Sequence, residues 1–188
     1  MTLLVLGLAL FLGIHTFTTL RSSRAVMLAR LGEGSYKGLY SVISAAGIAL
    51  IVIGFARYRS EGYIVVWDPP DFLRPVTLVL MWFSFVALAA AYAPVGRLKS
   101  ALKHPLLVGV KAWALAHVLA NGDLGSILLF GTFLGWAVYD RIALKRRGDA
   151  GPPSAPVGIG DGVAVVIGTA AYTLMFWLHP IAFGVPIG

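Results

Sequence analysis

The chain has 188 residues, of which 59% are hydrophobic and only 12% are charged, and its mean hydropathy is +0.85. This composition excludes an ordinary soluble domain, which carries about 25% charged residues. The absence of cysteine excludes disulfides, iron–sulfur clusters and covalent or thiolate-ligated haem. The net charge of +7 does not indicate nucleic-acid binding, because nearly all of the basic residues lie in short loops between apolar segments, where they act as topology signals.

Six apolar segments approach the roughly 20 residues that a helix needs to cross a bilayer. We therefore predict an all-α integral membrane protein, a bundle of about six transmembrane helices in one membrane domain covering residues 1–188. The fourth segment is short, and the tight-turn sequence Asn121-Gly122-Asp123 joins it to the fifth as an antiparallel helical hairpin. The expected spans are Leu3–Leu20, Leu39–Ala56, Val76–Ala93, Leu106–Ala120, Leu124–Ile142 and Gly162–Leu178.

The basic residues predict an orientation. Most of the 15 lysines and arginines lie in the first, third and fifth loops. By the positive-inside rule these loops are cytoplasmic, and both termini lie outside, on the periplasmic side. The first segment lacks a basic start and is followed by Arg21 and Arg24 instead of a cleavage site, so we expect it to remain in the mature protein.

Two of the loops have distinctive compositions. The outer loop 57–75 carries Tyr63, Trp67 and Phe72 around two prolines. These aromatic residues either anchor the loop at the membrane interface or form a lid over a buried site. The segment Gly148–Gly160 holds three prolines and is expected to be a flexible cytoplasmic linker.

His15 is the most unusual residue of the first span. An imidazole among hydrocarbon side chains is costly and often marks a functional site. Phe11, Thr18 and Thr19 share its helix face, so we expect this face to point into the bundle. His15 is then either a metal ligand or a hydrogen-bonding group between helices.

The remaining histidines lie toward segment ends. His117 lies near the outer end of the fourth span, where it is either a ligand or an interfacial residue bonded to Asn121 or Asp123. His179 stands directly before Pro180 and is most simply a helix-end residue. His104 precedes Pro105 among basic residues, so a site role and an interfacial role near lipid phosphate both remain open.

Lys111 lies seven residues after His104, on nearly the same helix face. An ammonium group this deep either snorkels to the surface or faces an anion, for example a haem propionate or the carboxylate of Asp140. Depth leaves the metal partner of His15 open: His15 lies about 8 Å and His117 about 20 Å from the same side. The difference of about 12 Å is at the limit for two ligands of one haem, and His104 fits His15 equally well.

Several motifs resemble the NnrU family. They are Gly13-Ile14-His15 with Thr18-Thr19-Leu20-Arg21, Lys103-His104-Pro105, Gly109-Val110-Lys111, the run from Ala116 to Asp123, and Tyr139-Asp140-Arg141. NnrU-like proteins are bacterial inner-membrane proteins associated with nitrite and nitric oxide reductase systems in denitrification. The family is similar to plant zeta-carotene isomerase, a membrane enzyme that uses non-covalent haem b. In that relative the haem ligands are a histidine on the first shared helix and one thirteen residues after an HP pair.

The resemblance implies an inner-membrane b-type haem protein with His15 and His117 as iron ligands and His104 as the substitute for His117. Lys111, Arg21 and Lys103 are candidate partners of the haem propionates. The resemblance leaves open whether the chain is an enzyme, with sensing and isomerase-like chemistry as the two directions. The alternative is a cofactor-free accessory or assembly protein for a nitrogen-oxide reductase. A zinc site from His15, His104 and a carboxylate is a further possibility.

Overall fold

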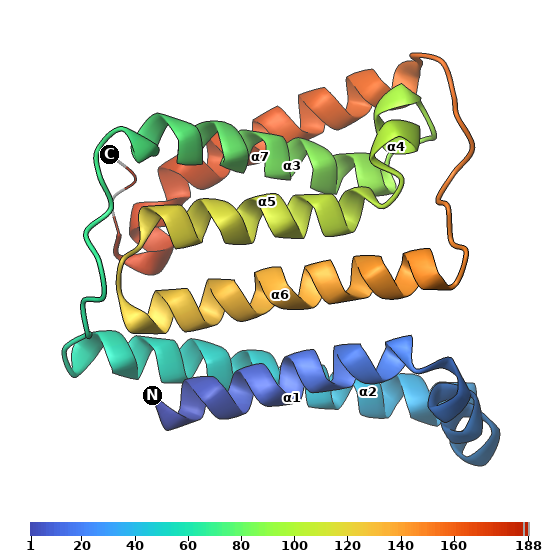
Figure 1. Ribbon diagram of the computed structural model, residues 1–188, viewed down its shortest axis with the longest axis horizontal. Coiled ribbons are helices and arrows are strands. Elements are labelled where there is room, and N and C mark those ends of the chain that lie inside the picture. The colour runs from blue at the N-terminus through green and yellow to red at the C-terminus, as the bar shows by residue number, and fades with distance from the viewer. Residues whose placement is uncertain (186, 188) are drawn as a thin grey trace. The chain divides into compact units, whose positions relative to one another are not determined.

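The computed structural model describes residues 1–185 and 187, and this part of the chain is helical except for its connections and one isolated β-bridge. Five helices are long and apolar enough to cross a membrane, and α5 is shorter, as the sequence predicted for the fourth span. The chain is thus a multi-pass membrane protein by helix length and composition. The helices are α1 Thr2–Thr19, α2 Arg21–Ser60, α3 Leu73–Tyr92, α4 Arg97–Leu102, α5 Pro105–Ala120, α6 Leu124–Arg146 and α7 Ile159–Phe183 (Figure 1).

The predicted first loop is helical, which corrects the sequence-based boundary. Only Leu20 separates α1 from α2, and α2 begins at Arg21 instead of near Leu39. Residues 21–31 are rich in alanine, leucine, methionine and arginine, which favour helix wherever nothing interrupts it. The interruption comes at Gly32, whose φ of 75° and ψ of 163° kink the helix and are accessible mainly to glycine.

The last helix also extends beyond its predicted end. Helix α7 continues through Pro180 to Phe183, so His179 lies inside the helix and is not its final residue. The left-handed Gly184, with a φ of 67°, ends it, as glycine commonly does after a helix C-terminus. The short helix α4 was not predicted, because its six residues are too few to show a helical repeat of apolar side chains.

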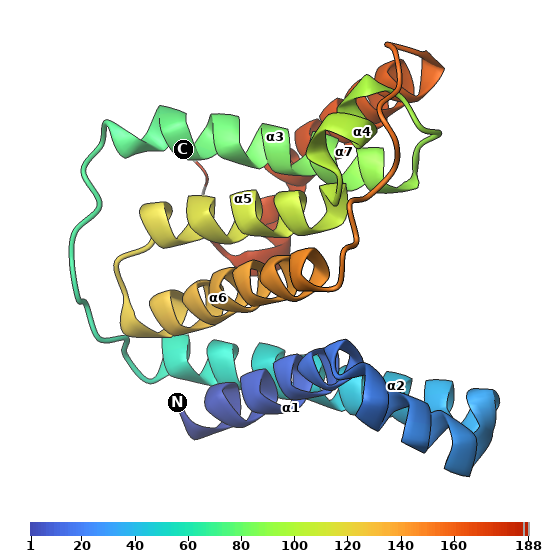
Figure 2. The ribbon, with the colours of Figure 1, turned by 45° about the vertical axis from the view of Figure 1, so that its right-hand side comes forward.

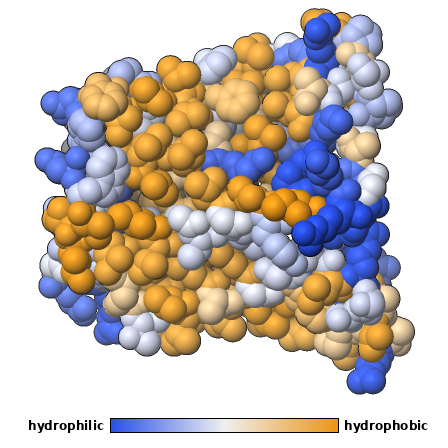
Figure 3. Space-filling view, viewed as in Figure 1, coloured by the Kyte–Doolittle hydropathy of each residue, from blue (hydrophilic) through white to orange (hydrophobic). Residues whose placement is uncertain are grey.

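The chain divides into two compact units, described here one at a time. Unit 1 comprises Met1–Asp68 and Asn121–Ala143, and unit 2 comprises Pro69–Ala120 and the residues from Leu144 onward. On the face that Figure 3 shows, hydrophobic residues cover most of the helices of each unit, and hydrophilic residues gather mainly near helix ends. This distribution is expected when lipid is the solvent of the helix faces.

Within unit 1, α1 and α2 pack closely through glycines (Figure 2). A Cβ atom built on Gly47 would lie 2.8 Å from the backbone nitrogen of Phe11, and one built on Gly7 would lie 2.6 Å from that of Ile51. Gly54 is equally tight against the backbone of Leu4. Small residues allow such close approach, which is the usual basis of helix association in membranes.

The first part of the loop between α2 and α3 is held by backbone hydrogen bonds within unit 1. The Val66 N–H donates to the carbonyl of Gly122 at 2.8 Å, and the Leu124 N–H donates to the carbonyl of Ile64 at 2.9 Å. The hydroxyl of the buried Tyr58 accepts from the Ile64 N–H at 3.0 Å. The loop is therefore tied to the turn 121–123, and these bonds would have to break before residues 64–67 could move as a lid.

Within unit 2, α3 packs against both α5 and α7. Gly109 approaches the side chain of Leu88, and Gly168 approaches the backbone of Val86. The buried Ser84 hydroxyl donates to the Gly109 carbonyl at 2.8 Å. These contacts fix the face of α5 that lies against α3.

Asp161 joins the N-termini of two helices in unit 2. Its carboxylate accepts backbone N–H bonds from Gly158 at 2.8 Å, Arg97 at 3.0 Å and Leu98 at 2.6 Å. Helix N-termini leave such N–H groups without intrahelical partners, and a carboxylate is well suited to them. One side chain therefore caps both α4 and α7.

Candidate functional site

His15 lies in an aromatic environment built by all three helices of unit 1. Its ring centroid is 4.1 Å from that of Phe11 on α1, 5.3 Å from Tyr40 on α2 and 5.7 Å from Trp136 on α6. The prediction that His15 points toward other helices is confirmed. Of the two hydroxyls on this face, that of Thr18 donates to a carbonyl of its own helix, whereas that of Thr19 also lies 3.3 Å from the Tyr139 hydroxyl on α6.

The hydrogen bond of His15 decides its tautomer. Nδ1 lies 2.6 Å from the backbone carbonyl oxygen of Phe11, one turn earlier. A carbonyl oxygen can only accept, so Nδ1 carries the proton. In the neutral imidazole the lone pair then lies on Nε2, the atom that would bind a metal.

His117 repeats this arrangement in unit 2. Its Nδ1 lies 2.9 Å from the carbonyl oxygen of Trp113, again one turn earlier, and the two rings are 5.3 Å apart. Nδ1 is therefore the protonated nitrogen here too. His179 on α7, which the sequence analysis treated as a helix-end residue, lies close enough to His117 on α5 to interact with it electrostatically. The two residues are far apart in the sequence, so this proximity was not expected.

His104 has a different set of partners. Its Nε2 lies 3.2 Å from the backbone oxygen of Asp149 and 3.7 Å from the Asp149 carboxylate, and its side chain is 13% exposed. The preceding Lys103 has a φ of 60°, and the His104 N–H donates to the carbonyl of Leu102 at 2.6 Å. This is the geometry of a classic γ-turn, which is rare and strained. The turn presents His104 to the segment predicted as a linker.

That segment is held at further points within unit 2. The Ala155 N–H donates to the Ser100 hydroxyl at 3.3 Å, and the Gly151 N–H donates to the Asp149 carboxylate at 3.0 Å. Gly151 also approaches the backbone of Lys103 so closely that a Cβ atom could not fit there. Residues 149–155 thus follow a defined path across the turn between α4 and α5.

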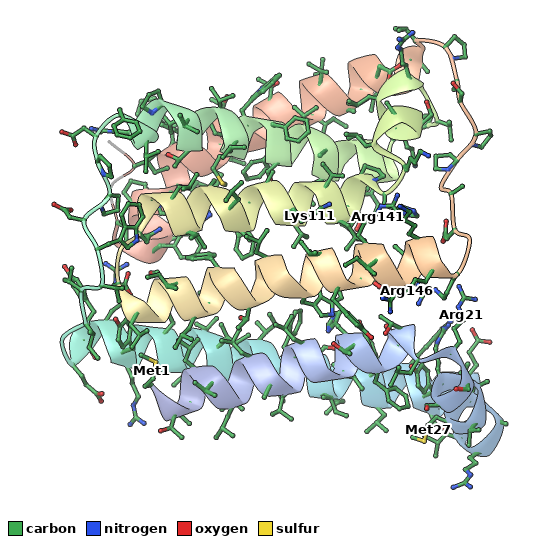
Figure 4. The ribbon with its side chains drawn as sticks, in the orientation of Figure 1. Met1, Arg21, Met27, Lys111, Arg141 and Arg146 are labelled. Carbon is green, nitrogen blue, oxygen red and sulfur yellow. The ribbon has the colours of Figure 1, made fainter. Side chains whose placement is uncertain are left out.

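The three candidate cations differ in burial. Arg21, at the start of α2, and Lys103 are exposed, whereas Lys111 on α5 is half-buried. Figure 4 shows Arg21 at the end of unit 1 where α1 ends, and Lys111 within α5. Among the described residues, none of the three has a carboxylate partner.

The described residues contain no group of three or more histidine, aspartate or glutamate side chains placed to hold a metal ion. A structural zinc ion usually takes four such ligands or cysteines. A zinc site built from His15, His104 and a carboxylate is therefore not supported.

The family described as NnrU protein matches residues 3–187, nearly the whole chain. The chain belongs to the NnrU family. No curated protein and no solved structure matches it.

The candidate residues of this NnrU chain fall in both units. His15 and Arg21 belong to unit 1, and the remaining four belong to unit 2: His117, Lys111, His104 and Lys103. In each unit one histidine, His15 on the candidate span α1 and His117 on the shorter apolar helix α5, has its Nδ1 bonded to a carbonyl of its own helix. Sequence reasoning identified both histidines but not the aromatic partners of His15, because ring contacts between helices leave no pattern in a single sequence.

Proposed function

We propose that this NnrU chain is a membrane-embedded b-type haem protein in which His15 and His117 would hold the haem iron through their imidazoles. The observation that carries the proposal is the bond from Nδ1 of each histidine to the carbonyl oxygen four residues earlier. Both imidazoles are thereby prepared as neutral ligands through Nε2. His104 differs from both, because it is Nε2 of this residue, at 3.2 Å, that lies against a backbone oxygen, that of Asp149.

Histidines that bind metals typically donate their second ring N–H to a carbonyl or carboxylate, which fixes the tautomer and the orientation of the ring. His15 meets this condition, and the rings of Tyr40 and Trp136 restrict its rotation further. When bound, a haem supplies redox and ligand-exchange chemistry at its iron. The contribution of the chain is to hold two neutral imidazoles in a largely apolar environment.

The cations of the chain support an anionic group at the site. Lys111 is half-buried in an apolar helix and lacks a carboxylate partner among the described residues. A cation at such a position is expected to pair with an anion or to line a polar cavity. We propose Lys111, Arg21 and Lys103 as partners of the haem propionates.

The proposed cellular role is in nitrite and nitric oxide metabolism at the bacterial inner membrane. This role rests on the association of NnrU-like proteins with denitrification. The isomerase direction rests on the similarity of the family to a haem-dependent isomerase. We propose sensing and isomerase-like chemistry as the two activities to be tested. A displaceable axial ligand would separate these activities from simple electron transfer.

The experiment is purification after haem-replete expression, with absorption spectra before and after dithionite reduction and with iron measured by mass spectrometry. We expect a Soret band in the wild type, its loss or a strong shift in His15→Ala and His117→Ala, and its retention in His104→Ala. A carbon monoxide or nitric oxide difference spectrum then shows whether an axial ligand can be displaced.

A colourless, iron-free wild-type protein that is nevertheless well folded would refute the proposal. It would favour the cofactor-free accessory protein, in which the same histidines only join helices. Equal Soret bands in the wild type and in both His15→Ala and His117→Ala would refute the ligand assignment while leaving a haem protein.

A further inference from the structure

Trp136 on α6 carries a buried polar atom that has no partner. Its indole Nε1 is inaccessible to solvent and makes no hydrogen bond in the structure. The indole ring stands edge-on to His15, with an interplanar angle of 90° and a centroid distance of 5.7 Å. The unsatisfied donor thus belongs to the side chain that α6 places against the proposed ligand.

A buried donor without an acceptor is destabilising, and native proteins keep few of them. Trp82 shows how this chain satisfies an indole elsewhere, since its Nε1 donates to the Thr169 hydroxyl at 3.0 Å. Phenylalanine would fill the place of Trp136 with a ring and no donor. An acceptor that belongs to a bound molecule would satisfy the Trp136 donor.

The position of Trp136 along α6 indicates which acceptor this is. Trp136 precedes Arg141 by five residues, and His15 precedes Arg21 by six, so both lie about 8–9 Å before a basic residue. The hydroxyls of Thr19, the last residue of α1, and Tyr139 on α6 are 3.3 Å apart within unit 1. Trp136 therefore stands beside the proposed ligand His15, on the stretch of α6 that leads to Arg141.

We propose that the Trp136 indole N–H donates a hydrogen bond to a propionate oxygen of the haem bound at His15. The inference rests on the proposed function. The oxygen atoms of haem b are those of its two propionates, so a hydrogen bond from the indole to oxygen must end on one of them. The bond would be charge-assisted, which makes it stronger than a neutral one, and it would orient the porphyrin relative to α6.

The test combines a residue change with a ligand change. The proteins are the wild type, Trp136→Phe and the control Trp82→Phe, whose indole bond lies within unit 2. The ligands are haem b and the two iron porphyrins in which one or the other propionate is replaced by a methyl group. Dissociation constants are measured by titrating each ligand into haem-free protein, together with the thermal stability of that protein.

We expect Trp136→Phe to weaken haem b binding by about 10- to 100-fold, as for the loss of a hydrogen bond to a charged group. One of the two monopropionate porphyrins should bind the wild type more weakly by a similar factor and should lose nothing further in Trp136→Phe. Trp82→Phe should leave all three affinities unchanged. Haem-free Trp136→Phe should be at least as stable as the wild type, because no bond is lost, whereas Trp82→Phe should be less stable.

The outcomes separate the two proposals. If the wild type binds none of the porphyrins, the proposed function fails, and this inference fails with it. If the wild type binds haem b and Trp136→Phe binds it equally well, the hydrogen bond is refuted and the haem proposal stands. If Trp136→Phe weakens all three porphyrins by the same factor, the indole acts by packing against His15, and the assignment to a propionate is overturned.

Discussion

Gly47 lies opposite the residue that anchors His15, and this makes it a sensitive position. A Cβ atom added there would lie 2.8 Å from the Phe11 nitrogen, 2.9 Å from its Cβ and 3.0 Å from its Cα. The carbonyl of Phe11 accepts the Nδ1 proton of His15. We therefore predict that Gly47→Ala lowers stability and also disturbs the imidazole, although residue 47 does not contact the ring.

The size of the effect follows from these distances. Carbon atoms in contact prefer separations of about 3.5–4.0 Å, so α1 and α2 must separate by roughly 1 Å at this point. The clash is with backbone atoms, which cannot rotate away as the end of a side chain can. Overpacking of this kind typically costs about 1–3 kcal/mol.

Gly13→Ala is the matched control. Gly13 lies on α1, two residues before His15. A Cβ atom added at Gly13 would have no heavy atom within 4 Å. Both substitutions gain the same helix propensity, about 1 kcal/mol for alanine over glycine. The difference between the two variants therefore isolates the packing cost.

The assay is unfolding in mixed detergent micelles, followed by circular dichroism, with a haem titration of the same samples. We expect Gly47→Ala to be less stable than Gly13→Ala by about 1–3 kcal/mol and to bind haem more weakly. Equal stabilities would show that α1 and α2 are not in tight contact at Phe11. A destabilised variant with unchanged haem affinity would show that the Phe11 carbonyl does not position His15.

Two further substitutions test the contacts within unit 2. Ser84→Ala removes the buried donor to the Gly109 carbonyl, and we expect the free energy of unfolding to fall by about 1 kcal/mol. Ser84→Thr keeps the hydroxyl but adds a methyl group at a buried position, so we expect it to lose stability by crowding. Asp161→Ala removes the shared cap of α4 and α7, so we expect faster hydrogen exchange at the backbone amides of Leu98 and Gly158, measured by mass spectrometry, with no change at Ser84. Unchanged exchange at those two amides would contradict the capping role.

Much of the helical arrangement could be predicted from the sequence. Runs of apolar residues are long enough to indicate membrane helices, and the structure has helices at all six expected positions. The turn at Asn121-Gly122-Asp123 also separates two helices as predicted. The first loop was misjudged because its arginines and serines indicate a polar segment, although polarity does not prevent a helix from continuing.

The sequence predicted His15 and His117 as site residues but gave no indication of their surroundings. An imidazole inside an apolar run stands out in the sequence, which is why His15 and His117 could be identified. The contacts of His15 with Tyr40 and Trp136 depend on how α1, α2 and α6 pack, and a single sequence does not encode that packing in a readable period. The same holds for Asp149, whose role in holding His104 follows from the path of the chain after α6.

The two backbone anchors have a consequence for the electrostatics of the proposed haem site. A carboxylate that accepts the Nδ1 proton of a ligand histidine makes the imidazole more basic and adds a negative charge beside the metal. His15 and His117 instead use carbonyl oxygens of their own helices, which add no charge and require no polar side chain from another helix. In a membrane this is the less costly solution, because a charge among hydrocarbon must be paired or hydrated. The ligands would then leave the iron relatively easy to reduce, and the balance of charge at the site would rest on Lys111, Arg21 and Lys103 facing the propionates.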